Sequence, residues 1–150
     1  MVILDFGNVP LAGGFLKKID FKNEKYYPLT IDYCADCFLV QVSNVISVDV
    51  LFREKYFFFS SAISTLVNHF KKFANEIYDS YLKNKKEPSC LEIGCNDGVL
   101  LKPLMALGVK AIGVDPATNV VEKIDSKDIT IYNDCFTENI AKHIRNSHGK

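Results

Sequence analysis

The sequence predicts an α/β fold: a partial Rossmann-like domain, preceded by a small β-rich zinc-binding-type module and a long helix. Three observations support this: a glycine turn directly after an apolar strand, an alternation of apolar strands with helical patterns downstream of it, and aromatic and β-branched segments near the start of the chain. The predicted divisions are residues 1–47, the β-rich module; 48–87, a helical connector; and 88–150, the N-terminal half of the Rossmann-like domain.

The glycine turn lies in residues 91–98, Leu-Glu-Ile-Gly-Cys-Asn-Asp-Gly. Gly94 and Gly98 bracket the turn, and apolar residues at helical spacing follow it, so backbone N–H groups are placed where a nucleotide cofactor approaches closely. A second apolar strand, residues 111–114, ends at Asp115. Asp115 follows the first glycine by about 20 residues, the separation expected of a ribose-binding carboxylate.

The middle of the loop favours S-adenosylmethionine as the cofactor. A dinucleotide fingerprint requires glycine where this chain has Asn96, because only glycine lets the backbone approach a pyrophosphate. Glu92 adds a negative charge that attracts a cationic ligand, and Asp115 can accept hydrogen bonds from ribose. NAD remains the alternative cofactor. The simpler interpretations are a solvated strand-end charge for Glu92 and a helix N-cap before Pro116 for Asp115.

Composition restricts the class of partner. The 18 basic and 18 acidic residues cancel, so no long-range field attracts nucleic acid or anionic lipid, and a small-molecule substrate is expected. No segment approaches the roughly 18 apolar residues of a membrane span, and no export signal is recognisable at the start, so a cytoplasmic location is predicted. Five cysteines in such a chain indicate reduced thiols or metal ligands.

The first module contains two predicted strands, residues 26–31 and 38–42, while Gly7 interrupts the chain before them. The connection between the strands holds Cys34 and Cys37, whose spacing lets two thiolates bind one zinc ion from a tight turn. This pair is half of a four-ligand site. A pair of free thiols is the alternative interpretation.

The connector contains the longest periodic segment, with apolar residues every three or four positions over residues 63–82. This spacing predicts one helix, capped at its start by Ser60 or Ser61. His69 lies beside the apolar stripe without a ligand partner at helical spacing. It is therefore interpreted as a packed or hydrogen-bonded histidine rather than a metal ligand.

The α/β alternation continues with a helix at 117–124, a strand at 129–132 and a helix at 137–145. Complete doubly wound sheets of this kind usually have about five to seven strands, so three strands indicate part of a longer domain. Asp134 and Phe136 follow the third strand, where they could accept from the adenine amino group and cover the adenine ring. A turn and a core aromatic are the alternatives for these two residues.

Six blocks of sequence together resemble the bacterial C-methyltransferases that act on nucleotide-linked deoxysugars. The blocks are residues 7–12 (Gly-Asn-Val-Pro-Leu-Ala), 27–29 (Tyr-Pro-Leu), 34–41 (Cys-x-x-Cys with Leu-Val-Gln), 56–61, 91–98 and 113–119 (Gly-Val-Asp-Pro-Ala-x-Asn). Members of this family have an N-terminal zinc-binding domain, a central S-adenosylmethionine domain and a C-terminal domain that helps to hold the sugar nucleotide.

The resemblance implies methyl transfer to a sugar carbon and assigns roles to individual residues. It makes Cys34 and Cys37 two of four zinc ligands, with the other two before Met1. The implied cofactor contacts are Glu92, Gly94, Asn96, Gly98 and Asp115, and the implied substrate-site residues are Tyr56, Ser60, Ser61 and His69. Phe38 departs from the glycine that usually follows the second cysteine. The family's catalytic acid and base are expected beyond Lys150, so the chain alone is expected to be inactive.

Two other classes of function stay open at this point: an NAD-type oxidoreductase and a noncatalytic ligand-binding or zinc-scaffold fragment. Both use the same glycine turn and cysteine pair. Binding of S-adenosylmethionine or NAD, and the zinc content of the protein, separate them.

Overall fold

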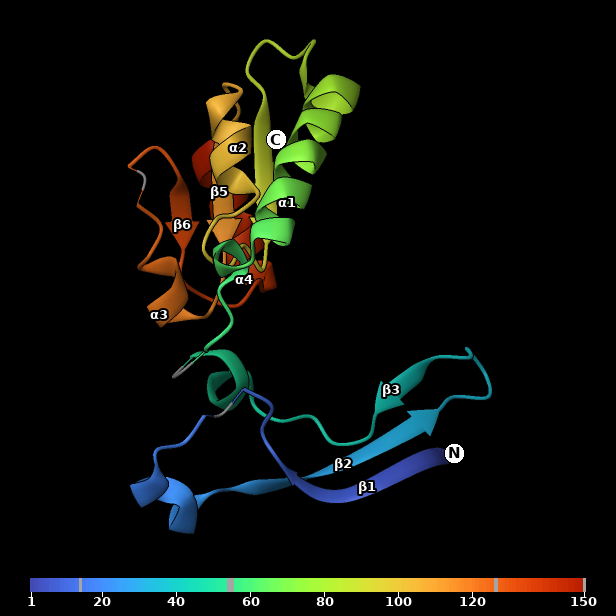
Figure 1. The fold of residues 1–150 in the computed structure, drawn as a ribbon. Coiled ribbons are helices and arrows are strands. Elements are labelled where there is room, and N and C mark those ends of the chain that lie inside the picture. Colours follow the sequence, from blue (N-terminus) through green and yellow to red (C-terminus); the bar gives the residue numbers. More distant parts are fainter. Residues whose placement is uncertain (14, 54–55, 126, 150) are drawn as a thin grey trace. The chain divides into compact units, whose positions relative to one another are not determined.

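The chain forms two compact units, Met1–Phe57 and Phe58–Lys150, each with its own three-stranded sheet (Figure 1). The computed structural model describes residues 1–13, 15–53, 56–125 and 127–149. Within those ranges, no helix has the length and apolar character needed to cross a membrane. The three-part division at residues 47 and 87 stays a prediction.

The N-terminal unit is built on an antiparallel sheet with the strand order β1-β2-β3 (Figure 1). A 3₁₀ helix joins β1 to β2, and a π-helical turn follows β3. The elements are β1 (Val2–Pro10), the 3₁₀ helix (Lys18–Asn23), β2 (Tyr26–Tyr33), β3 (Val40–Val42) and the π-helical turn (Asp49–Arg53).

Strand β1 was not predicted, because Gly7 indicates a break in a strand pattern. The structure places Gly7 at an irregularity of the ladder between Asp5 and Asn8, with φ +68° and its N–H donating to Asp5 Oδ1 at 2.8 Å. A glycine inside a strand marks such a bulge, since it adopts positive φ without steric penalty. The chain therefore continues as a strand past the glycine.

A tight turn delays the start of β3. Phe38 N–H donates to Cys34 O, and Cys34 N–H donates to Leu39 O, both at 2.9 Å. Phe38 has φ +63°, in the left-handed region. The strand predicted from Phe38 therefore begins two residues later, at Val40.

The N-terminal unit has no buried residue among those described up to Phe57. Large apolar side chains lie at its surface; examples are Phe6 at 54%, Phe15 at 80% and Ile19 at 82% exposure. This unit therefore lacks the hydrophobic interior that usually stabilises a domain.

The C-terminal unit has a parallel sheet with the strand order β4-β5-β6 (Figure 1). Ile93 pairs with Val114, so β4 and β5 end at the same level and their following loops meet at one edge. The elements are α1 (Ser64–Ile77), β4 (Ser89–Ile93), α2 (Leu101–Ala106), β5 (Lys110–Val114), α3 (Thr118–Val121), β6 (Thr130–Tyr132) and α4 (Glu138–His148). This arrangement confirms the predicted partial Rossmann-like fold.

Alternate residues of β5 pack on opposite faces of the sheet. Ala111 belongs to a buried cluster with Leu101 of α2, whereas Ile112 and Val114 pack with Ile144 of α4. A further cluster joins α1 to α2 through Ala74 and Leu104, both 0% exposed, with Leu100 and Val109. Helices therefore cover both faces, as a parallel sheet requires.

Strand β4 pairs with β5 on one side, and no second pairing of β4 occurs within the described residues. Its alternate side chains Leu91 and Ile93 are 38% and 58% exposed. A strand with an unpaired backbone row and exposed apolar side chains is an edge strand.

The prediction of one helix capped by Ser60 or Ser61 is wrong at its start. Ser60–Ala62 is a separate 3₁₀ turn, and α1 has Ile63 as its N-cap, without a side-chain cap. The N–H groups of both serines are instead bonded to side chains of a distant loop. At the other end, the helix continues as a π-helical segment, Tyr78–Leu82.

Candidate cofactor site

The glycine turn after β4 forms a compact loop. Gly94 and Cys95 both donate their N–H groups to Val114 O, at 2.8 and 3.2 Å, which ties the loop to the end of β5. Gly94 and Gly98 have φ of +75° and +74°, and Asn96 has φ +49°. Asparagine is among the few side chains that adopt this left-handed conformation readily. The three positions therefore fold residues 94–98 into a turn that leads into α2.

Glu92 lies at the end of β4 in a half-buried position. Burial, with the negative charges of Asp115 and Asp97 adding to it, raises the pKa of Glu92 to about 7. Its Oε2 is buried and accepts no hydrogen bond from the part of the chain that the structure describes. An unpaired buried acceptor is unfavourable unless a donor or a cation reaches it. The loop therefore presents a carboxylate that lacks a partner.

Asp115, at the end of β5, is 7% exposed, and both of its oxygens are engaged. Oδ2 accepts from Asn96 N at 2.9 Å, and Oδ1 accepts from Ala117 N at 2.8 Å. The N-cap interpretation is wrong, because the N-cap of α3 is Ala117. The carboxylate connects the loop after β4 with the chain entering α3.

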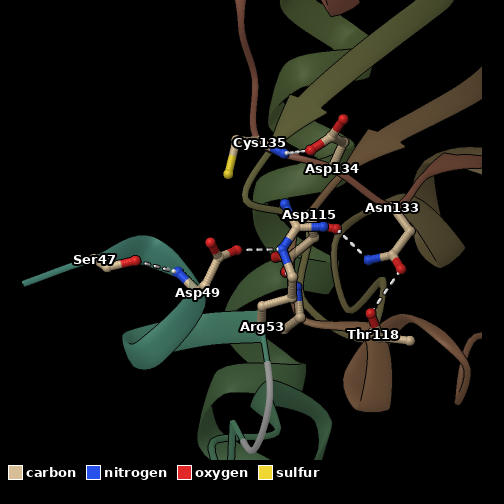
Figure 2. A network of polar contacts seen from close by, with 9 residues as sticks. Ser47, Asp49, Arg53, Asp115, Thr118, Asn133, Asp134 and Cys135 are labelled. Atoms are coloured by element: carbon tan, nitrogen blue, oxygen red, sulfur yellow. Dashed lines mark hydrogen bonds and ion pairs between the residues drawn. The ribbon is translucent and has the colours of Figure 1, made fainter.

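A second polar network holds the backbone of Asp115 (Figure 2). Asn133 Nδ2 donates to the Asp115 backbone carbonyl at 2.9 Å, and Thr118 Oγ1 donates to Asn133 Oδ1 at 2.8 Å. Sequence reasoning did not select Asn133 or Thr118, since an isolated polar residue after a strand carries no distinctive pattern. These bonds link the ends of β5 and β6 to the start of α3.

The side chains of Asn96 and Asp97 point to the segment before α1. Asn96 Oδ1 accepts from Ser60 N, and Asn96 Nδ2 donates to Phe58 O, both at 2.9 Å. The Asp97 carboxylate, 2% exposed, accepts from Ser61 N at 3.0 Å. Asp97 was not among the predicted site residues, although it lies between the two loop glycines.

The structure places the two predicted adenine contacts after β6. Asp134 Oδ1 accepts from Cys135 N at 2.8 Å (Figure 2). Phe136 is 41% exposed and lines a cavity of about 300 Å³ with residues of β4 and α4. None of residues 94–98 lines that cavity. The assignment of both residues to adenine stays a prediction.

The predicted substrate-site residues divide between the units. Tyr56 belongs to the N-terminal unit, where its ring lies 5.5 Å from that of Phe52. His69 is on the exposed side of α1, with its ring stacked on Phe73 at 6.1 Å. Ser60 and Ser61 are joined to the loop through their backbone. The structure thus brings the serines to the predicted cofactor loop.

The thiols fall into two classes. In the N-terminal unit, hydrogen bonds from the backbone N–H groups of Cys37 and Asp36 lower the pKa of Cys34. In the C-terminal unit, burial raises the pKa of Cys95 to about 12, with Asp115 and Glu92 adding to it, and burial also raises the pKa of Cys90. Cys34 is therefore the thiol prepared for thiolate chemistry, the form that binds metals.

The cysteine turn suits a zinc ion only in part. A turn whose N–H groups point at a thiolate fits a metal ligand, and two thiolates from one turn are a common half of a tetrahedral site. Within the described ranges, however, no three histidine, cysteine or acidic side chains are grouped closely enough to hold a metal. The described residues at this turn would therefore supply at most two of the four ligands of a tetrahedral zinc site.

Comparison with known families agrees with this architecture. Residues 66–149, more than half of the chain, match the model of a family described as "Methyltransferase domain". Residues 1–52 match a second model, described as "Putative zinc binding domain". The chain belongs to the methyltransferase domain family.

An individual relative spans both units. The chain is 28% identical over 148 residues to the C-methyltransferase NovU of Streptomyces niveus. The match covers 98% of this chain and 35% of the relative. The chain thus spans about a third of the length of the curated relative, and the resemblance to C-methyltransferases inferred from the motifs is confirmed.

Proposed function

We propose that the chain forms the cofactor-binding part of an S-adenosylmethionine-dependent methyltransferase. The observation that carries this proposal is the buried Glu92 Oε2, which has no partner in the described structure and lies beside a glycine loop. The match to a methyltransferase family supports it. S-adenosylmethionine would supply an electrophilic methyl group on a cationic sulfur.

The charge of the loop favours a cationic ligand over a diphosphate. Burial raises the pKa of Glu92 and the negative charges of Asp115 and Asp97 raise it further, so a positive ligand charge relieves a repulsion that the protein already contains. A pyrophosphate would add two negative charges there and would need free N–H groups. The N–H of Asn96 already donates to Asp115.

Asp115 is arranged to hold a ribose as well as the loop. Each of its oxygens accepts one backbone N–H bond, and a carboxylate oxygen has a second lone pair that can accept from a hydroxyl. Because two bonds fix the carboxylate, the ribose hydroxyls would meet an acceptor that does not have to reorient.

For the acceptor, we propose a carbon of a nucleotide-linked deoxysugar. The resemblance of the sequence motifs and the C-methyltransferase relative support this substrate class. In that reaction a base removes a proton beside a ketone, and the resulting carbanion takes the methyl group as the thioether leaves. The residues described here would position the cofactor. We assign no catalytic base among them.

For the N-terminal unit, we propose zinc binding through Cys34 and Cys37, with two ligands from elsewhere. The family match over residues 1–52 and the lowered pKa of Cys34 support this assignment. None of the five cysteines, all of which the structure describes, forms a disulfide, which supports a reducing location such as the cytoplasm. Zinc analysis of protein purified without chelator, beside a Cys34→Ser variant, tests the metal assignment, and an equal zinc content in both would contradict it.

Titration calorimetry tests the cofactor assignment. The chain is expected to bind S-adenosylmethionine saturably, and Glu92→Gln, which removes the charge at nearly constant volume, should weaken binding about tenfold, in the range of a charged hydrogen bond. The matched control is Glu122→Gln, an exposed carboxylate in the same unit, which should leave the affinity unchanged. Binding of NAD in preference to S-adenosylmethionine would overturn the proposal.

A further inference from the structure

The glycine loop is fastened to a segment more than thirty residues earlier in the chain. Three contacts make this connection: Asn96 with Ser60, Asn96 with Phe58, and Asp97 with Ser61. In all three, a loop side chain bonds to the backbone of residues 58–61, which we call the 58–61 strap. Two loop side chains therefore hold the backbone of the strap, in addition to the local bonds of its 3₁₀ turn.

Asn96 serves two partners at once. Its backbone N–H donates to Asp115 Oδ2, while its side-chain amide both accepts from and donates to the strap. The left-handed backbone at φ +49° separates these two directions. A displacement of Asn96 would therefore change its bonds both to Asp115, the proposed ribose carboxylate, and to the strap.

Asp97 holds the other end of the strap from a fully buried position. It is 2% exposed, and its two oxygens lie 3.0 and 3.3 Å from Ser61 N. A buried carboxylate needs donors, and this N–H supplies one. The hydroxyl groups of Ser60 and Ser61 make no hydrogen bond within the described residues, so the bonds to the loop leave them available to a ligand.

We propose that Asn96 and Asp97 are positioning residues that hold the 58–61 strap against the cofactor loop and thereby couple cofactor binding to the placement of Ser60 and Ser61 for the acceptor. This proposal rests on the proposed function for the identity of the cofactor. Because coupling between two sites is reciprocal, a cofactor that fixes the loop fixes the strap, and an ordered strap strengthens cofactor binding.

The first experiment measures the connection without any ligand. Single-residue amide hydrogen exchange by NMR is expected to show that Asn96→Gly accelerates exchange at Ser60 about tenfold, the loss of one ordinary hydrogen bond. Glycine retains the positive φ and removes only the side chain. Asn96→Asp retains the acceptor for Ser60 N and should restore its protection. The amide of Val114, in the core strand β5, should exchange at the wild-type rate and so report an intact fold.

The second experiment measures the coupling. Saturating S-adenosylmethionine should slow exchange at Ser60 and Ser61 in the wild-type chain, and this response should be lost at Ser60 in Asn96→Gly. An unchanged Ser60 exchange rate in Asn96→Gly would overturn the positioning role. An equal ligand response in both proteins would overturn the coupling. Failure of the wild-type chain to bind S-adenosylmethionine would instead overturn the proposed function, while the ligand-free result would still decide the positioning role.

Discussion

Every buried hydrophobic residue within the described ranges lies in the C-terminal unit, packed around a parallel sheet. The N-terminal unit arranges a comparable number of strands without burying any described side chain. Burial in the first case raises the pKa of Cys95 and Glu92, whereas hydrogen bonds from backbone N–H groups in the second lower that of Cys34. The same chain thus contains one unit packed around buried apolar side chains and another in which a polar turn lowers the pKa of a thiol.

This difference indicates separate sources of stability. Small domains with little buried surface usually depend on a metal, a disulfide or a partner. None of the five described cysteines forms a disulfide, so the proposed zinc ion is the stabiliser that the N-terminal residues themselves suggest. The following predictions break or sharpen this comparison.

The largest expected difference is in thiol reactivity. Because the pKa of Cys34 lies below its ordinary value of 9.0 and that of Cys95 is about 12, their thiolate fractions at neutral pH differ by at least about a thousandfold. Alkylation of chelator-treated protein, followed by peptide mass spectrometry, should modify Cys34 long before Cys95. Added zinc should then protect Cys34 and Cys37 and leave the labelling of Cys95 unchanged. Equal labelling of both cysteines would remove the contrast between the units.

Core truncation should affect the two units unequally. Leu104→Ala should lower the free energy of unfolding of the C-terminal unit by about 2–5 kcal/mol, because the side chain is 0% exposed and its removal leaves a cavity. Phe6→Ala in the N-terminal unit should change stability by about 0.5 kcal/mol or less, since Phe6 is 54% exposed. Urea titrations of both variants provide the measurement, and similar losses would contradict the interpretation of burial.

Gly113 tests how tightly the core of the C-terminal unit is packed. A Cβ at this position would lie 2.6 Å from Cys95 Sγ and 2.8 Å from Leu101 Cδ1, so Gly113→Ala should be destabilising by about 1–3 kcal/mol. The loss should be smaller in a Cys95→Ala background, where the sulfur is absent. A thermodynamic double-mutant cycle measures this coupling, and strict additivity would show that the core relaxes around the methyl group.

The smallest predicted effect is the pH dependence caused by Glu92. Its pKa of about 7 means that acidification from pH 7.5 to 6 protonates the carboxylate, and with a roughly tenfold difference in affinity between the charged and uncharged side chain this should weaken S-adenosylmethionine binding about fourfold. Without ligand the sign is opposite: since the pKa in the folded state is raised from 4.5, the Glu92 contribution to stability is present below pH 4.5 and lost as the pH rises through about 7. In Glu92→Gln, both the affinity measured by calorimetry and the free energy of unfolding measured by denaturation should vary less with pH over this range. A pH dependence that is unchanged by the substitution would show that another group causes it.

Much of the C-terminal unit was predictable from sequence, because its signals are local. Apolar runs and a glycine turn specify β4, β5 and the loop, and the spacing to Asp115 follows from the fold. The long helix was predicted too far toward its N-terminus, because the N–H groups of Ser60 and Ser61 bond to a distant loop rather than opening α1. Contacts between segments far apart in the chain produce no periodic pattern in the sequence from which they could be predicted.

The same limit explains the residues that sequence reasoning missed. Asp97 and Asn133 owe their roles to partners 36 and 18 residues away, and neither role follows from neighbouring residues. Strand β1 was missed because a local signal was misleading. Gly7 indicates a break in the strand, but the structure accommodates it in a bulge and the strand continues. A single sequence therefore gives the cofactor loop more readily than the network around it.

The edge strand β4 has a consequence for how the chain behaves at high concentration. Its outer row of backbone donors and acceptors, which has no strand partner among the described residues, is flanked by the exposed Leu91 and Ile93 and can extend the sheet with a strand from another molecule. Purified chain should thus be prone to sheet extension and precipitation as its concentration rises. The substitution Ile93→Lys should oppose such strand pairing, since a charged side chain on an edge strand disfavours the approach of a second edge strand.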